Sequence, residues 1–405
     1  MRILHTSDWH LGQHFMGKTR QAEHHALINW LLAQVTEHQI DAVLIAGDIF
    51  DTGAPPSYAR ELYSSLIVRL HDLGAHLVIL AGNHDSVATL AESKTLLARL
   101  GTSVIPGVAE DLDEQVILLH QRNGQPGALL CAIPYIRPRE VLQSQPGQSA
   151  DEKQQNLQEA IHTLYQTTWQ RAQAQCQALG GHLPIVATGH LAVVGASASE
   201  SVREIYVGSL KAYPADAFPP ADYIALGHIH RPQDCGQPHI RYCGSPIALS
   251  FDEANQAKQM LLVELDDTGL HQITPLAIPC FQPLASVRGN LADLPGAIAK
   301  AAVAGSVATP VWLEVVISAD DYLSDLQIRV DEICAGLPVE VLRLRRERKE
   351  ASAALHSEAK ETLDELSPDD VFAQRMAAET LADDLQDKLK ARYRQVVAEL
   401  TEPGV

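Results

Sequence analysis

Residues 77–85 read LVILAGNHD, an apolar run that ends in polar side chains. Short runs of β-branched and other apolar residues bounded by glycine are typical of strands that are buried on both faces. Gly82 is followed by Asn83, His84 and Asp85, whose side chains belong to the types that bind metal ions. The stretch therefore predicts a buried strand that carries candidate metal ligands at its carboxyl end.

The same design occurs five times along the chain. Apolar runs over residues 1–6, 42–46, 185–188 and 223–226 also lead into aspartate or histidine within a few residues. Glycine before several of these polar residues lets the backbone turn sharply and approach an ion closely. Helical patterns over residues 24–37 and 58–73 separate the first three runs. This alternation predicts an α/β fold, in which ligands gather at the carboxyl ends of the strands, so we expect the five strand ends to converge.

Seven of these polar residues are candidate metal ligands: Asp8, His10, Asp48, Asn83, His190, His228 and His230. The members of the Asp-x-His and His-x-His pairs are two residues apart, so they point the same way in extended chain. Seven ligands exceed the needs of one ion, whereas two ions that share a carboxylate use them all. Oxygen and imidazole ligands without sulfur suit Mn²⁺, iron or Zn²⁺ better than Ca²⁺. Asn83 and His84 are adjacent and point apart, so that one can bind metal while the other faces a substrate.

Composition limits the classes of function. The chain has 405 residues, with 31 basic against 50 acidic ones and a net charge of −19. Such an acidic protein is not a general nucleic-acid binder, because phosphate contacts need Lys and Arg; a polyanionic partner must meet a basic patch, metal ions or a second subunit. The six cysteines form no C-x-x-C pair, which argues against a zinc ribbon or a dithiol redox site. No run is long enough to span a membrane, so we expect a cytoplasmic protein with no membrane partner.

A phosphate-loop pattern occurs in residues 12–19, GQHFMGKT, which match G-x-x-x-x-G-K-[ST]. We nevertheless predict that this chain binds no nucleotide. The end of the preceding strand is already used by Asp8 and His10, so the loop begins too late to wrap a phosphate at that edge. Phe15 and Met16 are also bulky for a tight cradle of backbone amides.

The five motifs together resemble a known family, the calcineurin-like metallophosphoesterases. Its pattern of D-x-H, G-D, G-N-H-[DE], G-H and G-H-x-H is present in order. The segments HTSDWHLGQ, GDIFDTGAPPS, EIYVG (204–208), DYIALGHIHRPQ and YCGSPIALSFDE narrow the resemblance to the bacterial SbcD-type nuclease subunits. The resemblance covers most of residues 1–280 and implies a four-layer α/β/β/α core. The arginine of the related Ser/Thr phosphatases is replaced by Thr52, which argues against that branch.

The resemblance also implies the roles of the site residues. Asp8, His10, Asp48 and His230 would hold one ion, while Asp48, Asn83, His190 and His228 would hold the other. The ions would be two Mn²⁺ per chain, with Mg²⁺, iron or Zn²⁺ as alternatives. His84, oriented by Asp85, would stabilise developing charge or protonate the leaving oxygen. For Asp51 two interpretations stay open: it contacts the site, or it caps the helix that begins near Pro55.

The activity implied by the resemblance is that of a metal-dependent DNA nuclease. It would act as a double-strand exonuclease and a single-strand and hairpin endonuclease with an SMC-like ATPase partner, SbcC, in DNA end processing, repair, recombination and replication. The assembly implied is a homodimer within a heterotetramer, with the helices over 58–73 and 87–100 as candidate dimer contacts. Two rival hypotheses are a metallophosphodiesterase of small substrates and a non-catalytic scaffold of the same fold.

The remainder of the chain divides into three further segments. After a nuclease domain over 1–280, residues 281–346 are predicted to form a small α+β capping domain, with strands over 281–287, 311–318 and 339–344 and helices over 291–303 and 322–335. Residues 347–366 look like a tether. Ser367 and Pro368 begin a helical segment over 367–405 whose apolar stripe includes Val371, Leu381, Leu385, Leu389, Val396 and Leu400. Such a stripe must be buried, either on the chain's own body or, as the resemblance favours, on SbcC.

A basic run stands out in this acidic chain, and it comprises Arg343, Arg345, Arg346, Arg348 and Lys349. One interpretation is a contact with the DNA backbone or with a partner. The other is a solvated exit from the last strand of the capping domain.

Overall fold

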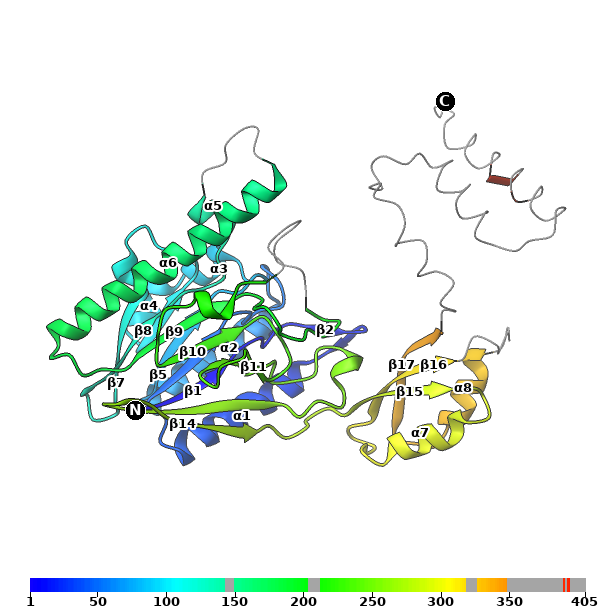
Figure 1. Ribbon diagram of the computed structural model, residues 1–405. Coiled ribbons are helices and arrows are strands. Elements are labelled where there is room, and N and C mark those ends of the chain that lie inside the picture. The colour runs from blue at the N-terminus through cyan, green and yellow to red at the C-terminus, as the bar shows by residue number, and fades with distance from the viewer. Residues whose placement is uncertain (143–148, 203–211, 318–325, 348–388, 390–391, 394–405) are drawn as a thin grey trace, which may run out of the picture. The chain divides into compact units, whose positions relative to one another are not determined.

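Two mixed sheets position the predicted strand ends (Figure 1). The computed structural model describes residues 1–142, 149–202, 212–317, 326–347, 389 and 392–393. The first sheet has the order β14-β13-β1-β4-β5-β6, in which β1, β4, β5 and β6 run parallel. Its strands are β1 (Arg2–Thr6), β4 (Ala42–Ala46), β5 (His76–Leu80), β6 (Thr102–Ile105), β13 (Gln259–Asp266) and β14 (Gly269–Ala277).

The second sheet has the order β11-β12-β10-β9-β8-β7, in which β12, β10, β9 and β8 run parallel. Its strands are β7 (Val116–His120), β8 (Pro126–Cys131), β9 (Ile185–His190), β10 (Tyr223–Gly227), β11 (Gln233–Asp234) and β12 (Ile240–Tyr242). All five predicted strands are therefore present, but three of them belong to the first sheet and two to the second.

Helices cover the outer face of each sheet. Because successive side chains of a strand point to opposite faces, Val43 and Ile45 of β4 pack in a core with α1 (Gln21–Glu37) and α2 (Ser57–Asp72). Leu44, between them, packs in a second core with Val186 and other residues of the second sheet. The long helix α6 (Ala150–Ala178) covers the other face of that sheet (Figure 1). This is the α/β/β/α layering that the family resemblance implied.

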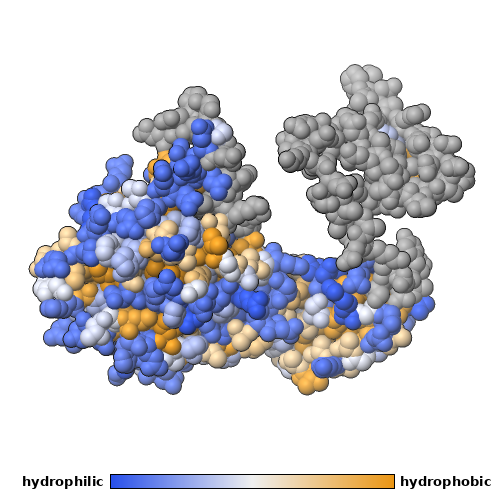
Figure 2. Space-filling model, viewed as in Figure 1, coloured by the Kyte–Doolittle hydropathy of each residue, from blue (hydrophilic) through white to orange (hydrophobic). Residues whose placement is uncertain are grey.

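Most of the apolar side chains are buried in these cores, and the strands that carry the site are buried along most of their length. The face of the molecule in Figure 2 is mainly hydrophilic, with hydrophobic patches between. Among the described residues, no helix combines the length and the apolar character that crossing a membrane requires.

One predicted helix differs in the structure. The segment 87–100 forms two short helices, α3 (Val87–Ala91) and α4 (Lys94–Ala98), instead of one. The break lies at Ser93, whose ψ of 7° is not helical. A further short helix, α5 (Pro138–Val141), follows β8.

The segment after residue 280 contains the predicted strands and helices, but its fold class is not the predicted α+β. Its strands are β15 (Leu284–Gly289), β16 (Val311–Ile317) and β17 (Val339–Arg346), and its helices are α7 (Leu294–Ala302) and α8 (Leu326–Cys334). All three strands are parallel, so this is an α/β unit and the prediction of α+β was wrong. The physical reason is that a helix between consecutive strands returns the chain to the same end of the sheet. The unit has its own apolar core, while residues Met1–Arg346 as a whole form one set of mutual contacts. The boundary at residue 280 stays a prediction.

The phosphate-loop pattern lies in a two-stranded hairpin, β2 (His14–Phe15) and β3 (Lys18–Thr19). The Phe15 ring stacks on Trp312 of β16 with centroids 5.8 Å apart and planes 8° from parallel. Lys18 forms an ion pair with Glu340 of β17. The hairpin therefore anchors the three-stranded C-terminal unit to the part of the chain that forms the two large sheets.

Several predictions lie outside the described residues. They include most of the tether, most of the C-terminal helical segment with its apolar stripe, and the segment 204–208.

Candidate metal centre

The five predicted strand ends meet at one place. Asp8 and His10 follow β1, Asp48 follows β4, Asn83 and His84 follow β5, His190 ends β9, and His228 and His230 follow β10. Six of these residues are almost completely buried: Asp8, His10, Asp48, His190, His228 and His230. Nitrogen and oxygen atoms of three overlapping groups lie within 4.8 Å of one another: Asp8, His10 and His230; His10, Asp48 and His84; and Asp8, Asp48 and His190.

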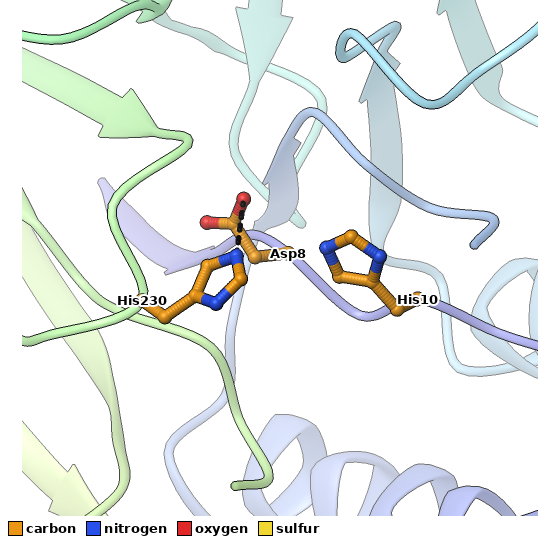
Figure 3. Close-up of side chains that lie close together, drawn as sticks. All are labelled: Asp8, His10 and His230. Carbon is orange, nitrogen blue, oxygen red and sulfur yellow. Dashed lines mark ion pairs between the residues drawn. The ribbon is translucent and has the colours of Figure 1, made fainter. Parts of the chain in front are cut away.

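The first group has the spacing expected of ligands around a cation (Figure 3). His230 Nε2 lies 4.0 Å from Asp8 Oδ1, too far for a hydrogen bond. His10 Nε2 lies 3.7 Å from Asp48 Oδ2 and is buried without a hydrogen-bond partner in the part of the chain that the structure describes. A buried, unsatisfied imidazole nitrogen that faces carboxylates costs free energy, and a bound cation removes that cost.

The contacts of His190 lead to the same conclusion. His190 Nδ1 donates to the carbonyl oxygen of Ala46 at 2.9 Å, so in the neutral ring Nε2 carries the lone pair. That Nε2 lies 3.0 Å from Asn83 Oδ1 and 3.2 Å from Asp48 Oδ2. Asn83 Oδ1 is also 3.2 Å from His228 Nδ1. A lone pair that faces two oxygen acceptors requires a cation between them, either a proton or a metal ion.

Backbone strain is concentrated at the candidate ligands. Asp8, His10, Asp48 and His228 have φ values of 55°, 49°, 50° and 93°, in the region that favours glycine. Backbone hydrogen bonds hold these turns, since the amides of Trp9 and His10 both donate to the carbonyl of Asp48. Such strain persists only where the surroundings over-determine it, which is typical of functional sites.

Two glycines provide space for neighbouring atoms of the site, because they have no side chain. A Cβ at Gly82 would lie 2.1 Å from Asp48 Oδ1, and a Cβ at Gly227 would lie 1.9 Å from the carbonyl oxygen of Ala46. The glycines that precede the polar residues thus allow the close approach of strand ends from both sheets.

His84 contacts other residues than Asn83 does. Its amide donates to Asp48 Oδ1 at 2.8 Å, and its ring contacts the His10 ring edge-on at 4.6 Å. Its Nδ1 donates to the carbonyl oxygen of Asp51 at 2.8 Å. The Asp51 carbonyl therefore orients the ring.

Asp85 connects two of the strand ends that carry the site. Its carboxylate is buried and accepts hydrogen bonds from the backbone amides of Gly82, Ile49 and Phe50 at 2.8, 3.2 and 2.9 Å. These bonds tie the end of β5 to the end of β4. The orienting role of Asp85 toward His84 stays a prediction.

The alternatives for Asp51 are decided by its contacts. Asp51 Oδ1 accepts a hydrogen bond from His10 Nδ1 at 3.1 Å, whereas the residue that precedes α2 is Pro56, with no side-chain cap. Asp51 thus contacts the site from behind a candidate ligand.

The charges at the site favour cations. Burial tends to raise the pKa of Asp48, but the neighbouring imidazoles, foremost His190, outweigh burial and lower this pKa. Burial tends to lower the pKa of His190, yet the Asp48 carboxylate raises it to about 9. Burial and then the proximity of Asp48 raise the pKa of Asp85 to about 6. Asp48 therefore remains ionised and attracts positive charge, which a divalent cation supplies.

Two arginines of the basic run form ion pairs within the C-terminal unit. Arg343 Nη2 and Arg345 Nε lie 2.5 and 2.7 Å from Oε1 of the buried Glu314 in β16. The Arg343 guanidinium also lies over the Phe251 ring at 5.4 Å. Arg346 ends β17, and Arg348 and Lys349 lie outside the described residues. These contacts favour the interpretation of a strand exit for Arg343 and Arg345.

One residue at the site was not predicted. Glu253 is fully buried, and its Oε1 lies 3.1 Å from His230 Nδ1. Glu253 lies in the segment YCGSPIALSFDE that carries the family resemblance, but nothing in its spacing linked it to the His-x-His pair.

Comparison with family models gives two matches. Residues 1–232 match the model described as calcineurin-like phosphoesterase. Residues 280–380 match the model described as type 5 capsule protein repressor C-terminal domain.

Three relatives are similar over much of their length, and each is the SbcD subunit of a bacterial SbcCD nuclease. The chain is 49% identical over 392 residues, 96% of each chain, to the SbcD protein of Escherichia coli strain K12. It is 31% identical over 365 residues to the SbcD protein of Rhodobacter capsulatus, covering 87% of this chain and 89% of the relative. For the SbcD protein of Bacillus subtilis, the identity is 33% over 271 residues, covering 65% and 66%.

Proposed function

Because the chain belongs to the calcineurin-like phosphoesterases, and within them to the SbcD family of nuclease subunits, we infer that it is a nuclease that hydrolyses the phosphodiester bonds of DNA. The observation that carries this inference is the convergence of aspartate, histidine and asparagine side chains from two sheets on one largely buried site. The orphaned His10 Nε2 and the lone pair of His190 Nε2 support cation binding there.

The division of ligands between two ions is part of the proposal. Asp8, His10, Asp48 and His230 hold one ion, and Asp48, Asn83, His190 and His228 hold the other. Two divalent ions bound there, Mn²⁺ or alternatively Mg²⁺, iron or Zn²⁺, would supply positive charge for the phosphate and would lower the pKa of a water molecule. The approach of the Asp48 carboxylate to both His10 and His190 supports its role as the shared ligand.

His84 acts on the leaving group in this proposal. Its Nδ1 proton is donated to the Asp51 carbonyl, so a proton exchanged with the substrate is carried by Nε2. A positioned imidazole can protonate the leaving 3′-oxygen or stabilise the charge that develops on it.

The partner and the substrates follow from the family. We propose that the chain works with SbcC on DNA ends, hairpins and single strands, as a homodimer within a heterotetramer. Its net charge of −19 supports the need for a partner, because a chain this acidic contacts DNA phosphates poorly by itself. Arg346, Arg348 and Lys349 remain candidates for contact with DNA or a partner. The segments that form α2, α3 and α4 remain candidates for the dimer contact.

Linear duplex DNA should be degraded only when a suitable divalent ion is present. We expect shortening in Mn²⁺, none in excess chelator, and stimulation by SbcC with ATP. The measurement is a gel assay of end-labelled duplex, together with a nitrophenyl phosphodiester as a small substrate. Hydrolysis of the small substrate alone, even with SbcC and ATP, would favour the small-substrate phosphodiesterase. A protein that binds Mn²⁺ yet hydrolyses neither would favour the scaffold.

Deletion of residues 367–405 should separate chemistry from assembly. Residues Met1–Arg346 form their own set of contacts, so the shortened chain should keep its ions and its hydrolysis of the nitrophenyl ester. If the C-terminal segment docks on SbcC, then co-purification with SbcC and stimulation by ATP should both be lost. Undiminished binding of SbcC would place the partner site elsewhere, and a markedly lower unfolding temperature would show that the segment packs on its own body.

A further inference from the structure

Glu253 lies directly behind the candidate ligand His230. It ends the short 3₁₀ helix Phe251–Glu253, and its Oε1 lies 3.1 Å from His230 Nδ1. The other ring nitrogen, Nε2, lies 4.0 Å from Asp8 Oδ1, on the side where Asp8 and His10 gather (Figure 3). The imidazole of His230 thus stands between a buried carboxylate and a candidate ion site.

The hydrogen bonds around Glu253 determine which nitrogen of His230 carries the proton. Oε1 accepts from the hydroxyls of Ser199 and Ser201 at 2.7 and 2.5 Å, and Ser201 Oγ is 2.7 Å from His230 Nδ1. A carboxylate has no proton to give, and both hydroxyls donate to it. The proton facing Glu253 and Ser201 must therefore belong to Nδ1, which leaves the lone pair on Nε2 directed toward the ion site.

The second oxygen of Glu253 is also fully used. Oε2 accepts from Lys258 Nζ at 2.7 Å, from the amide of Leu249 at 3.1 Å and from Ser245 Oγ at 3.2 Å. Lys258 is itself mostly buried and its Nζ lies 2.9 Å from Ser245 Oγ. The Glu253 carboxylate is held in one orientation, because both of its oxygens accept hydrogen bonds and the Lys258 ammonium group lies beside it. The carboxylate in turn holds the His230 ring in place.

The imidazoles of the two proposed ion sites are supported differently. In the first, His10 Nδ1 donates to the Asp51 carboxylate and His230 Nδ1 to the Glu253 carboxylate. In the second, His190 Nδ1 donates to the carbonyl of Ala46, which carries no charge. An anionic acceptor strengthens the hydrogen bond and makes the opposite nitrogen a better metal ligand.

We propose that Glu253 is a positioning residue that fixes the tautomer and orientation of His230. Through it, the site of Asp8, His10 and His230 becomes the tighter of the two ion sites. The proposal rests on the two-ion assignment made above, and it adds an order of filling: the carboxylate-backed site fills first.

The test is a calorimetric titration of metal-free protein with Mn²⁺, comparing wild type with Glu253→Gln combined with Lys258→Met. The double variant removes both charges of the buried pair, because removing one alone would leave the other unpaired. We expect two binding events of unequal affinity in wild type. In the double variant the tighter event should weaken by about 10- to 100-fold, the usual effect of losing such a partner, while the weaker event is unchanged.

Ser245→Ala is the matched control. It removes a hydrogen bond to Oε2 of Glu253 and leaves the bond between Oε1 and His230. Its tighter Mn²⁺ affinity should fall much less than that of the double variant, because Lys258 and the Leu249 amide still hold Oε2. The proposal is overturned if the double variant binds both ions as wild type does, if both events weaken equally, or if Ser245→Ala shows the same loss.

Glu253→Asp is a second test in case the double variant does not fold. It keeps a negative charge near Lys258 but draws the carboxylate back from His230 by one methylene. The same selective loss, of smaller size, supports the proposal, and unchanged affinities overturn it. A wild-type protein that binds no Mn²⁺ would overturn the two-ion assignment as well, whereas normal wild-type binding with unaffected variants would overturn the role of Glu253 alone.

Discussion

Replacing Asp48 with alanine is expected to abolish metal binding and hydrolysis together. The Asp48 carboxylate is the ligand that the two proposed ions share, and its Oδ2 lies 3.2 Å from His190 Nε2 and 3.7 Å from His10 Nε2. Two bound ions contribute several kcal/mol of charge stabilisation, so turnover should fall by about four orders of magnitude or more. The measurements are bound Mn²⁺ per chain and the rate of hydrolysis of a nitrophenyl phosphodiester.

Asp48→Asn is the control that separates charge from shape. It keeps an oxygen that can accept from the His84 amide, which donates to Asp48 Oδ1 at 2.8 Å. We expect a folded protein with a smaller loss of affinity than the alanine variant. An alanine variant that keeps two ions and near-normal turnover would refute the two-ion assignment.

His84→Gln is expected to separate binding from chemistry. In the proposal, His84 faces the substrate while the seven candidate ligands hold the ions, and its Nδ1 donates to the Asp51 carbonyl. Turnover should drop by roughly two to four orders of magnitude, the usual contribution of general acid–base catalysis. Mn²⁺ content and the affinity for DNA should be unchanged, as measured by calorimetry and by a binding assay with SbcC present.

His182→Gln provides the matched substitution, because His182 is exposed in the segment between α6 and β9. It should leave turnover unchanged. Loss of metal in His84→Gln would show that His84 is itself a ligand, and would contradict the division of roles.

The elements were predictable wherever the signal is local. The strands β1, β4, β5, β9 and β10 were predicted from short apolar runs. A strand that is buried on both faces is apolar along its length, so its own sequence identifies it without knowledge of the strands beside it. The prediction failed where neighbours decide the structure. The break at Ser93 and the parallel order of β15, β16 and β17 depend on how the segments pack, which periodicity alone does not report.

The candidate ligands were predictable for a related reason. Each one follows its own strand within a few residues, so the residue type and its distance from the strand end were visible locally. Glu253 was not, because it reaches His230 from a non-repetitive segment with no fixed spacing. The roles of Asp51 and Asp85 likewise follow from hydrogen bonds with residues on other strand ends.

By itself, the sequence determined which residues lie at the strand ends. It therefore determined the chemical groups of the site, which are carboxylates, an amide and imidazoles. Only the tertiary structure decided that these ends come from two facing sheets. It also decided that Asp8, His10, Asp48 and His228 adopt left-handed backbone conformations. The contacts that decide whether a carboxylate or a backbone carbonyl accepts from an imidazole of the site are likewise tertiary. The physical reason is the range of the forces: a strand and its polar end are set by neighbours in the chain, whereas strain and orientation in the site are set by packing between residues far apart in the sequence.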